Sequence, residues 1–259
     1  MPAETIKKTI LSGKMRNIRL LVEYEGTDYA GWQAQKNGRS IQGSIVEAVK
    51  RLTHEDTTVN GASRTDAGVH AYGQVACFHT ASVIPPANFR SGLNMFLPDD
   101  IVVKEAIDVP IDFDPRRRSL GKTYVYRVLN RPYPSALLRR FAWHVARPLD
   151  IELMRLAAAH MIGEKDFTSL RSVESDALHS MREVRSIDIS AKDGELIEFE
   201  VKGNAFLRHM VRIMVGTLVD VGRGRLRHGN IPGIISDKDR RSAGITAPPH
   251  GLTLIQVDY

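Results

Sequence analysis

The residues best suited to chemistry lie in a short run of small side chains, residues 61–75, in which a single residue separates Arg64 from Asp66. The run has too many glycines for a helix interior and does not alternate like a strand until its end, which predicts a tight loop. Small neighbours would let a substrate or another backbone approach the Asp66 carboxylate closely. Such a carboxylate can act as a nucleophile or as a base, although a bare Arg-x-Asp is more often a solvated ion pair.

Charge is unevenly distributed along the 259 residues, whose formal net charge is +6. Residues 1–110 hold twelve basic and twelve acidic side chains, and residues 151–259 hold fifteen of each. Residues 111–150 hold nine basic and three acidic side chains, so the whole excess lies in one mid-chain segment. A concentrated basic segment is typical of a protein that binds a polyanion, although a charge run can also serve solubility alone.

Strands and helices alternate around the predicted loop in the first part of the chain. Apolar residues recur at every second position in 17–25 and 72–79, which predicts two strands. Ser40 can cap a helix whose apolar residues recur at helical spacing up to Leu52. The remaining elements expected here are a short strand over 57–60, a helix over 88–97 and a strand that begins at Ile101.

The basic segment leads into a strand with two tyrosines. Residues 123–129 alternate, with Tyr124, Tyr126 and Val128 on one face. Basic residues interleaved with tyrosines suit nucleic acid, because aromatic rings stack on bases while Arg and Lys meet phosphates. A tyrosine that only packs in a strand is the commoner case. The later elements expected are a helix over 150–161, a hairpin of strands over 184–190 and 196–201, and a last strand over 252–259.

A long apolar helix is predicted from about residue 203 to residue 221, and it should be buried because it is apolar almost all round. Its polar residues gather near its start, where Arg208 and Arg212 are four residues apart and would share a face. Two cations in the first turns of a helix oppose its dipole. We therefore expect an anion beside them, either a carboxylate or a phosphate.

Several other kinds of site find no support in the sequence. Zinc motifs, a dinucleotide fingerprint and a hydrolase elbow do not occur, so no metal or cofactor is expected. No apolar run reaches the roughly 18 residues of a membrane helix, and residues 1–16 lack the apolar core of a secretory signal. The single Cys77 permits no internal disulfide, which suits a reducing compartment, and we interpret it as a core residue.

Six segments together resemble the tRNA pseudouridine synthase A family. The main one is S-R-T-D-A-G-V-H-A-Y-G-Q-V at 63–75, in which Ser63 stands where glycine is more frequent. The others are Y-E-G-T-D-Y-A-G-W-Q-A-Q at 24–35, L-N-M-F-L-P-D-D-I at 93–101, G-E-K-D-F-T-S-L at 163–170, H-M-V-R at 209–212 and A-P-P-H-G at 247–251. The resemblance covers about residues 17–259.

The resemblance implies an α+β protein with the pseudouridine synthase fold, a mainly antiparallel curved sheet flanked by helices. Two similar halves would surround a central cleft, with a boundary near residue 110. We expect a flexible basic arm over 1–16, an N-terminal half over 17–110 with the Asp66 loop, and a C-terminal half over 111–259. The resemblance also implies a homodimer, with one RNA spanning both subunits. We expect the protein in the cytoplasm, a reducing compartment that suits a single cysteine.

The implied reaction converts uridine to pseudouridine at positions 38, 39 and 40 of the tRNA anticodon stem-loop, without a cofactor. Asp66 would be catalytic, with its action as nucleophile or base left open, and Arg212 would pair with it. Tyr124 would stack on the extruded uracil, and Arg64 would hold the place or the phosphate of the flipped nucleotide. Further candidates for RNA contact are Arg116, Arg117, Arg118, Lys122, Arg208, His209, Arg223 and Arg225.

Two alternatives stay open at this point. One is a pseudouridine synthase that acts on another RNA, because the resemblance does not fully determine the target. The other is a non-catalytic RNA-binding protein or chaperone on the same fold. Such a protein would keep the basic segment but lose Asp66 or Tyr124, and both residues are present.

Overall fold

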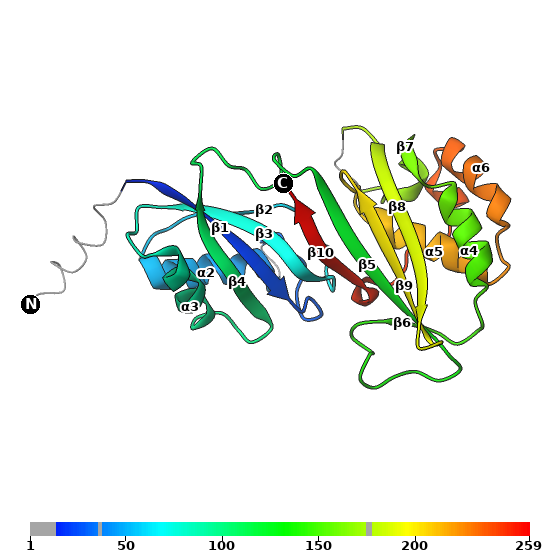
Figure 1. Cartoon of the computed structure of the whole chain (residues 1–259), viewed down its shortest axis with the longest axis horizontal. Coiled ribbons are helices and arrows are strands. Elements are labelled where there is room, and N and C mark those ends of the chain that lie inside the picture. The colour runs from blue at the N-terminus through cyan, green and yellow to red at the C-terminus, as the bar shows by residue number, and fades with distance from the viewer. Residues whose placement is uncertain (1–13, 36–37, 175–177) are drawn as a thin grey trace, which may run out of the picture. The chain divides into compact units, whose positions relative to one another are not determined.

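The computed structural model describes residues 14–35, 38–174 and 178–259. Contacts divide the chain into two compact units, one that ends at Ser119 and also includes Tyr259, and one that spans Leu120–Asp258. Each unit combines a mainly antiparallel sheet with helices (Figure 1), which confirms the expected α+β class. How the two similar halves expected of the family map onto these units stays a prediction. Residues 1–13 of the predicted basic arm lie outside the described residues.

The first unit is built on an antiparallel sheet in which β1 lies between β3 and β4, and β2 pairs with the other edge of β3. Alternation along β1 buries Ile18, Leu20 and Val22 completely, as the sequence pattern predicts. The strands are β1 (Arg16–Tyr24), β2 (Val59–Gly61), β3 (His70–Thr80) and β4 (Ile101–Val109).

Two helices pack against this sheet, α2 (Ile41–Thr53) and α3 (Pro86–Asn94). The Ser40 hydroxyl caps α2 by accepting a hydrogen bond from the Gly43 amide at 3.2 Å, as expected. α3 begins two residues before its predicted start, because a proline such as Pro86 fits the first turn of a helix.

Arg16 belongs to β1 rather than to the arm to which the sequence assigns it. Its guanidinium binds both carboxylate oxygens of Asp108 at 2.8 Å and donates to the carbonyls of Ser82 and Ile84. These contacts hold the first residue of the strand against β4. At the other end of the chain, Tyr259 packs on Phe113 with ring centroids 5.2 Å apart and donates a hydrogen bond to the Pro115 carbonyl at 2.8 Å.

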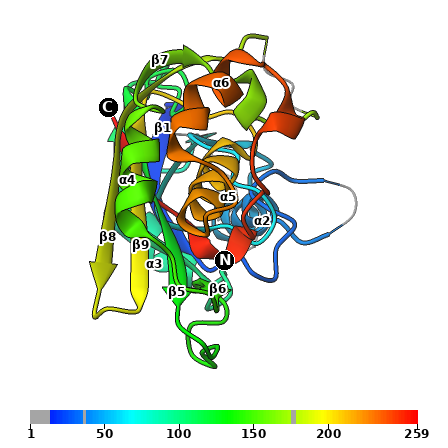
Figure 2. The ribbon, with the colours of Figure 1, turned by 90° about the vertical axis from the view of Figure 1, so that its right-hand side faces the viewer.

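The second unit has a sheet with the strand order β10-β5-β9-β8-β7, and β6 runs parallel to β5 beyond this path. Helices α4 and α5 lie side by side against one face of the sheet (Figure 2). The strands are β5 (Gly121–Asn130), β6 (Trp143–Val145), β7 (Gly163–Asp166), β8 (Met181–Lys192), β9 (Leu196–Gly203) and β10 (Leu252–Asp258). The helices are α4 (Ile151–Ala159), α5 (Met210–Gly222) and α6 (Ile231–Ser236), with short 3-10 turns η1 (Thr168–Leu170), η2 (His228–Asn230), η3 (Arg240–Ser242) and η4 (Pro249–Gly251).

The apolar helix α5 is buried as predicted, but it starts seven residues later than expected. Every residue of α5 except Arg212 is buried. Gly203 is the last residue of β9, where it pairs with Val184 of β8. His209 then takes a left-handed conformation (φ 62°) at the helix N-cap. The prediction that Arg208 and Arg212 share a helix face is therefore wrong, because Arg208 precedes the helix.

Gly216 is the point at which α5 touches the segment 244–247. A methyl group on Gly216 would lie 1.9 Å from the Ile245 carbonyl oxygen. We expect Gly216→Ala to lower the free energy of unfolding by about 1–3 kcal/mol, as overpacking does. Urea denaturation would measure this loss.

The control is Gly233→Ala in α6, where nothing lies within 4 Å of the added carbon. That change should be neutral or should stabilise by up to about 1 kcal/mol, because alanine favours a helix. Equal unfolding free energies for the two variants would contradict the expected clash.

Candidate active site

Asp66 lies in a tight loop between β2 and β3, where it is half-buried, while Arg64 is exposed and Thr65 is buried. Neighbouring backbone holds the loop at three points. The Trp32 amide donates to the Thr65 carbonyl at 3.0 Å, the Gly68 amide donates to the Tyr29 carbonyl at 3.4 Å, and the Val69 amide donates to the Asp66 carbonyl at 3.2 Å. The loop therefore presents the carboxylate from a backbone that is itself tied down.

Segment 26–35 supports this loop through two close approaches that only glycine permits. A methyl group on Gly31 (φ 99°) would lie 2.7 Å from the Thr65 carbonyl oxygen. A methyl group on Gly61 would lie 2.4–2.6 Å from the Trp32 indole, which is 1% exposed. Trp32 is thus a core residue that packs beneath the Asp66 loop on its interior side. A core position is the commoner role for a tryptophan.

A buried polar network fixes the backbone on both sides of Arg64. The fully buried Gln74 side chain accepts from the Ser63 amide at 3.2 Å and donates to the Ser63 carbonyl at 2.8 Å. The Tyr24 hydroxyl lies 3.4 Å from the Gln74 amide nitrogen and 2.7 Å from the Thr65 hydroxyl. Each member of this network finds a partner away from water, as a buried polar group requires.

Sequence reasoning overlooked Gln74 and Tyr24 as residues that shape the site. The available signal was a glutamine in an otherwise apolar strand, which must find hydrogen-bond partners if it is buried. The partner of Gln74 is a peptide group eleven residues away, and only the pairing of the strands brings the two together.

Tyr124 lies on β5 in the second unit, opposite Val201 of β9 and Leu254 of β10. Its ring is 6% exposed and meets Phe206 edge to face, with centroids 5.4 Å apart at 88°. Phe206, which sequence reasoning did not assign to the site, therefore sets the orientation of the Tyr124 ring.

Arg212 occupies the first turn of α5, and segment 244–247 holds it in place. Its Nε donates to the Ala247 carbonyl at 2.8 Å, and the Ala247 amide donates to the Arg212 carbonyl at 3.1 Å. Burial lowers the pKa of the nearby His250 below its ordinary value, and the positive charge of Arg212 acts in the same direction.

The pairing of Asp66 with Arg212 stays a prediction, because it joins the two units. Within the second unit, α5 contacts β5, so Arg212 and Tyr124 come from neighbouring elements. Arg64 and Asp66 lie together in the first unit.

The three consecutive arginines 116–118 are exposed on a turn that Asp114 organises. The Asp114 carboxylate accepts from the amides of Arg116 at 2.8 Å and Arg117 at 2.9 Å. The Arg117 side chain is 89% exposed, while Arg118 pairs with Asp112 at 3.0 Å. This geometry projects the guanidinium groups into solvent. Lys122 lies on β5 and is half-buried.

The other predicted RNA contacts differ in their surroundings. Arg208 is exposed and pairs with Glu174 at 3.1 Å. Arg223 and Arg225 share the buried carboxylate of Asp220, at 3.9 and 3.4 Å. Arg223 is only 17% exposed and burial lowers its pKa, whereas Arg225 is 58% exposed. Of these last two, Arg225 is the more accessible to a phosphate.

Three further observations concern kinds of site set aside above. Cys77 is buried, which raises the pKa of its thiol to about 12. No His, Cys, Asp and Glu side chains gather in metal-binding groups of three or more within the described ranges. No helix in this part of the chain is both long and apolar enough to cross a membrane.

Comparison with known proteins identifies close relatives over nearly the whole chain. The family model described as tRNA pseudouridine synthase matches residues 20–116 and 157–259. A protein of Myxococcus xanthus named tRNA pseudouridine synthase A is 48% identical over 95% of this chain and 92% of its own length. One of Acetivibrio thermocellus with the same name is also 48% identical, over 95% of this chain and 100% of its own. Among solved structures, a chain of an archaeal box H/ACA sRNP Nop10-Cbf5 complex is 13% identical, with a TM-score of 0.37, and the match covers 84% of this chain and 46% of that one.

The buried glutamine generates a prediction about the mobility of the Asp66 loop. Gln74→Glu keeps the shape of the side chain but turns an oxygen toward the Ser63 carbonyl in place of the donor. We expect the free energy of unfolding to fall by about 1–3 kcal/mol, because a buried acceptor loses its partner. Hydrogen exchange should also become faster at the Trp32 amide, which donates to the loop.

The matched control is Gln33→Glu, because Gln33 is exposed and pairs only with Gln42 among the contacts described here. Exchange at the Trp32 amide should stay at its wild-type rate in this control. Unchanged exchange in Gln74→Glu would show that the network does not hold the loop.

Proposed function

The chain belongs to the tRNA pseudouridine synthase family, and on that premise we propose that it modifies positions 38, 39 and 40 of the anticodon stem-loop, with Asp66 as the catalytic carboxylate. As a member of the family it is an isomerase that converts uridine in tRNA to pseudouridine. The observation that supports Asp66 best is its place in a loop whose backbone is tied down on both sides of the carboxylate. A reacting group held in this way loses little freedom when the substrate arrives.

The reaction rearranges bonds within one nucleotide. The bond from N1 of uracil to C1′ of the ribose breaks, the base turns, and C5 bonds to C1′. C5 gives up a proton and N1 takes one up, so atoms and electrons balance. Asp66 acts in this sequence as a nucleophile or as a base, and a guanidinium such as Arg212 beside it would fix the orientation of the carboxylate.

The target uridine must leave the stack of bases before it can react, and extrusion costs a few kcal/mol. Tyr124 stacks on the extruded uracil and helps to move the C5 proton, while Arg64 holds the place of the flipped nucleotide. The exposed arginines 116–118 offset the cost through contacts with phosphates. Further contacts with RNA phosphates come from Lys122, Arg208, His209 and Arg225. Arg223 also contributes to these contacts, although its side chain is largely enclosed.

The functional unit in this proposal is a homodimer in the cytoplasm, with one tRNA spanning both subunits. The family resemblance supports the dimer, and sedimentation of the protein with and without tRNA would test it. The alternative of a non-catalytic RNA-binding protein is less favoured, because the chain carries a carboxylate, a tyrosine and an arginine at the positions that the family uses for catalysis.

Asp66→Ala should abolish the release of tritium from C5-labelled uridine in unmodified tRNA, by a factor of roughly 1,000 or more, because removing a central catalytic group leaves only binding effects. The affinity for tRNA should stay within about threefold, because the phosphate contacts remain. The control is the exposed Asp99→Asn, which should keep the wild-type rate. Turnover by the Asp66→Ala variant would show that Asp66 is not catalytic. Tritium release from uridines outside the anticodon arm would show that the enzyme modifies another part of the tRNA.

Replacing Arg117 and Arg118 together with Ala should weaken tRNA binding and flatten its salt dependence. Two lost phosphate contacts would reduce the slope of log K against log salt by roughly 1.5. The charge-matched control replaces Lys192 and Arg241, both exposed elsewhere, with Ala. A filter-binding titration over several salt concentrations measures both slopes. Equal slopes in the two double variants would show that Arg117 and Arg118 do not contact RNA phosphates.

A further inference from the structure

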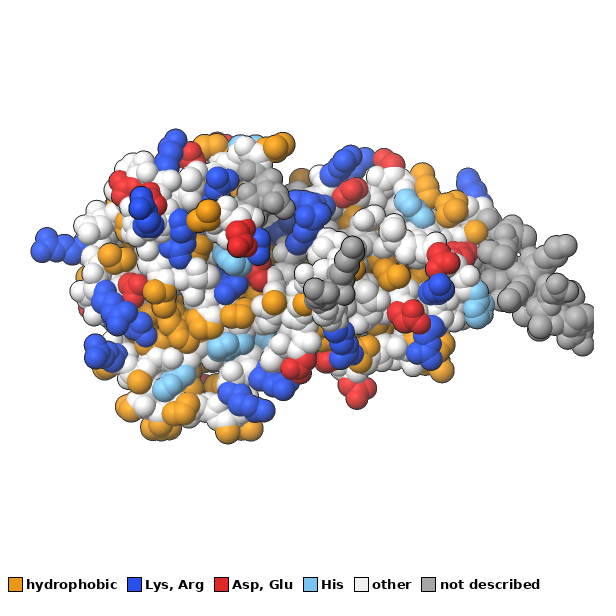
Figure 3. All heavy atoms as spheres, turned by 180° about the vertical axis from the view of Figure 1, so that it is seen from behind, with side chains coloured by type: hydrophobic (Ala, Val, Ile, Leu, Met, Phe, Trp, Pro, Cys, Tyr) orange, Lys and Arg blue, Asp and Glu red, His pale blue; other side chains and the backbone are white. Residues whose placement is uncertain are grey.

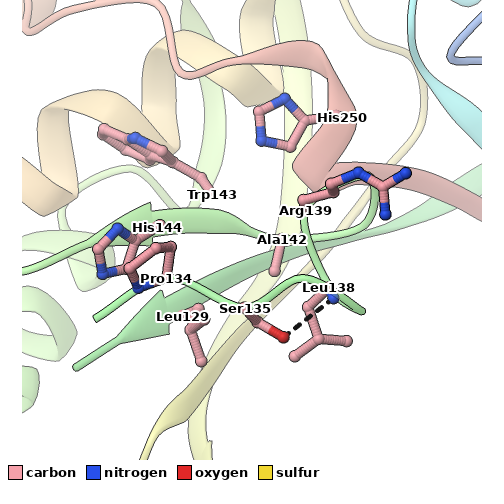
Figure 4. A pocket seen from close by; sticks show the side chains of 9 residues that line it. All are labelled: Leu129, Pro134, Ser135, Leu138, Arg139, Ala142, Trp143, His144 and His250. Carbon is pink, nitrogen blue, oxygen red and sulfur yellow. Dashed lines mark hydrogen bonds between the residues drawn. The ribbon is translucent and has the colours of Figure 1, made fainter. Parts of the chain in front are cut away.

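The second unit contains a pocket of about 260 Å³ that none of the residues discussed for catalysis lines. Segment 131–142 folds over the junction of β5, β6 and η4 to form it (Figure 4). In Figure 4 the rings of Trp143 and His250 lie on one side and Leu129 and Leu138 on the other, with Ala142 between them. The volume lies below the roughly 300 Å³ at which pockets for drug-sized ligands begin, so it suits one small group.

The aromatic side of the pocket is held rigidly. The Trp143 indole meets Tyr126 edge to face, with centroids 6.5 Å apart at 90°, and the Arg223 guanidinium lies 5.4 Å from its centroid. Tyr126 is itself fully buried and donates to the Pro248 carbonyl at 2.7 Å. The indole therefore presents a surface whose orientation is set before any ligand binds.

The two histidines are also held by backbone contacts. His144 Nε2 lies 2.8 Å from the Arg131 carbonyl, and since a carbonyl only accepts, Nε2 is the nitrogen that carries the proton. His250 hydrogen-bonds to the backbone of Ala142, which ties η4 to segment 131–142. A planar group that enters the pocket thus meets rings and polar edges that are already in place.

Among the residues that line the pocket, Arg139 carries a formal charge, and its positive charge suits an anionic group such as a phosphate. Residues 120–149 contain six basic side chains and no acidic one. Arg127 pairs with Glu198 of β9 and Arg131 pairs with Glu195 in the turn before β9, but the lining residue Arg139 is exposed. Large apolar side chains are exposed beside it, Leu137 at 86% and Tyr133 at 58%. On the face seen in Figure 3, hydrophobic and basic side chains likewise gather over the second unit.

The Leu129 end of the pocket lies away from the place where Tyr124 would hold the target uracil. Leu129 lines the pocket and lies five residues along β5 from Tyr124. A strand rises about 3.3 Å per residue, so the two positions are roughly 16 Å apart. A base stacked on Tyr124 therefore does not reach the Leu129 end of the pocket, whereas His250 at the other end lies near Arg212. A ligand at the Leu129 end is thus a different group from the reacting uracil.

We propose that this pocket receives a second unstacked base of the bound RNA, a few nucleotides away from the target uridine. Single-stranded loops offer such bases, which proteins take up on aromatic rings while basic residues meet the adjoining phosphate. Stacking of one base contributes roughly 5- to 150-fold to affinity. The inference rests on the proposed function, because it takes the bound RNA to be a loop with unpaired bases.

The test couples a change in the pocket to a change in the RNA. Anticodon stem-loops are prepared with each loop base in turn replaced by an abasic nucleotide, and their Kd values are measured for the wild type and for Ala142→Leu, which fills the pocket. We expect one abasic position to weaken wild-type binding by about tenfold, within the range for one stacked base. The same abasic position should cause no further loss in Ala142→Leu. The control is Ala136→Leu, an exposed alanine of the same segment, which should behave like the wild type.

The proposal would be overturned if the abasic position weakened RNA binding by Ala142→Leu as much as it weakens binding by the wild type. It would also be overturned if Ala142→Leu bound intact RNA as tightly as the wild type does. If the wild-type protein bound full-length tRNA but not the stem-loop, the proposal that it acts on the anticodon arm would be wrong. The proposal for the pocket would then be tested with abasic nucleotides in the other tRNA loops.

A second measurement tests the proposal without Ala142→Leu, in case that variant does not fold. The chain has two tryptophans, so in Trp32→Phe all tryptophan emission comes from Trp143. Intact RNA should quench this emission, and the RNA with the critical abasic position should not. Equal quenching by both RNAs, or none by either, would also overturn the proposal.

Discussion

The structure of the site depends on one buried side chain, the carboxamide of Gln74, and the peptide group of Ser63 that it faces. The two hydrogen bonds between them fix the chain just before Arg64, and the hydroxyls of Tyr24 and Thr65 fix it just after. Because each of these polar groups is costly to bury alone, the network is stable only when it is complete. The loop that carries Asp66 is therefore specified by the interior of its own unit and needs no ligand to acquire its shape.

The second unit must also find partners for polar side chains in its interior, and it does so with charged residues. The largely buried helix α5 carries two charged side chains, Arg212 near its start and Asp220 near its end, and each of them requires a partner. Arg212 is bound to Ala247, while Asp220 collects Arg223 and Arg225. The arginines of this unit thus divide into those that hold the fold together and those left exposed to meet a polyanion, and sequence position alone does not separate the two groups.

Local patterns in the sequence are enough to predict much of this. Alternation identifies β1, β3 and β5, Ser40 marks the start of α2, and the small residues around Asp66 identify its loop. The start of α5 was not predictable in this way, because Gly203 is drawn into the sheet by pairing with Val184 and tertiary pairing overrides local helical preference. The Gln74 network was missed for the same reason, since its partners become neighbours only when β2 and β3 pair.

Tyr259 has a consequence for how the protein is made. The first unit is otherwise formed by residues up to Ser119, yet Tyr259 belongs to it, packing on Phe113 and binding the Pro115 carbonyl. During synthesis the chain grows from its N-terminus, and domains generally fold as they emerge. This unit can assemble its Asp66 loop early, but its packing is completed only after the whole second unit has left the ribosome. Maturation of the early unit thus waits on a residue translated long after it.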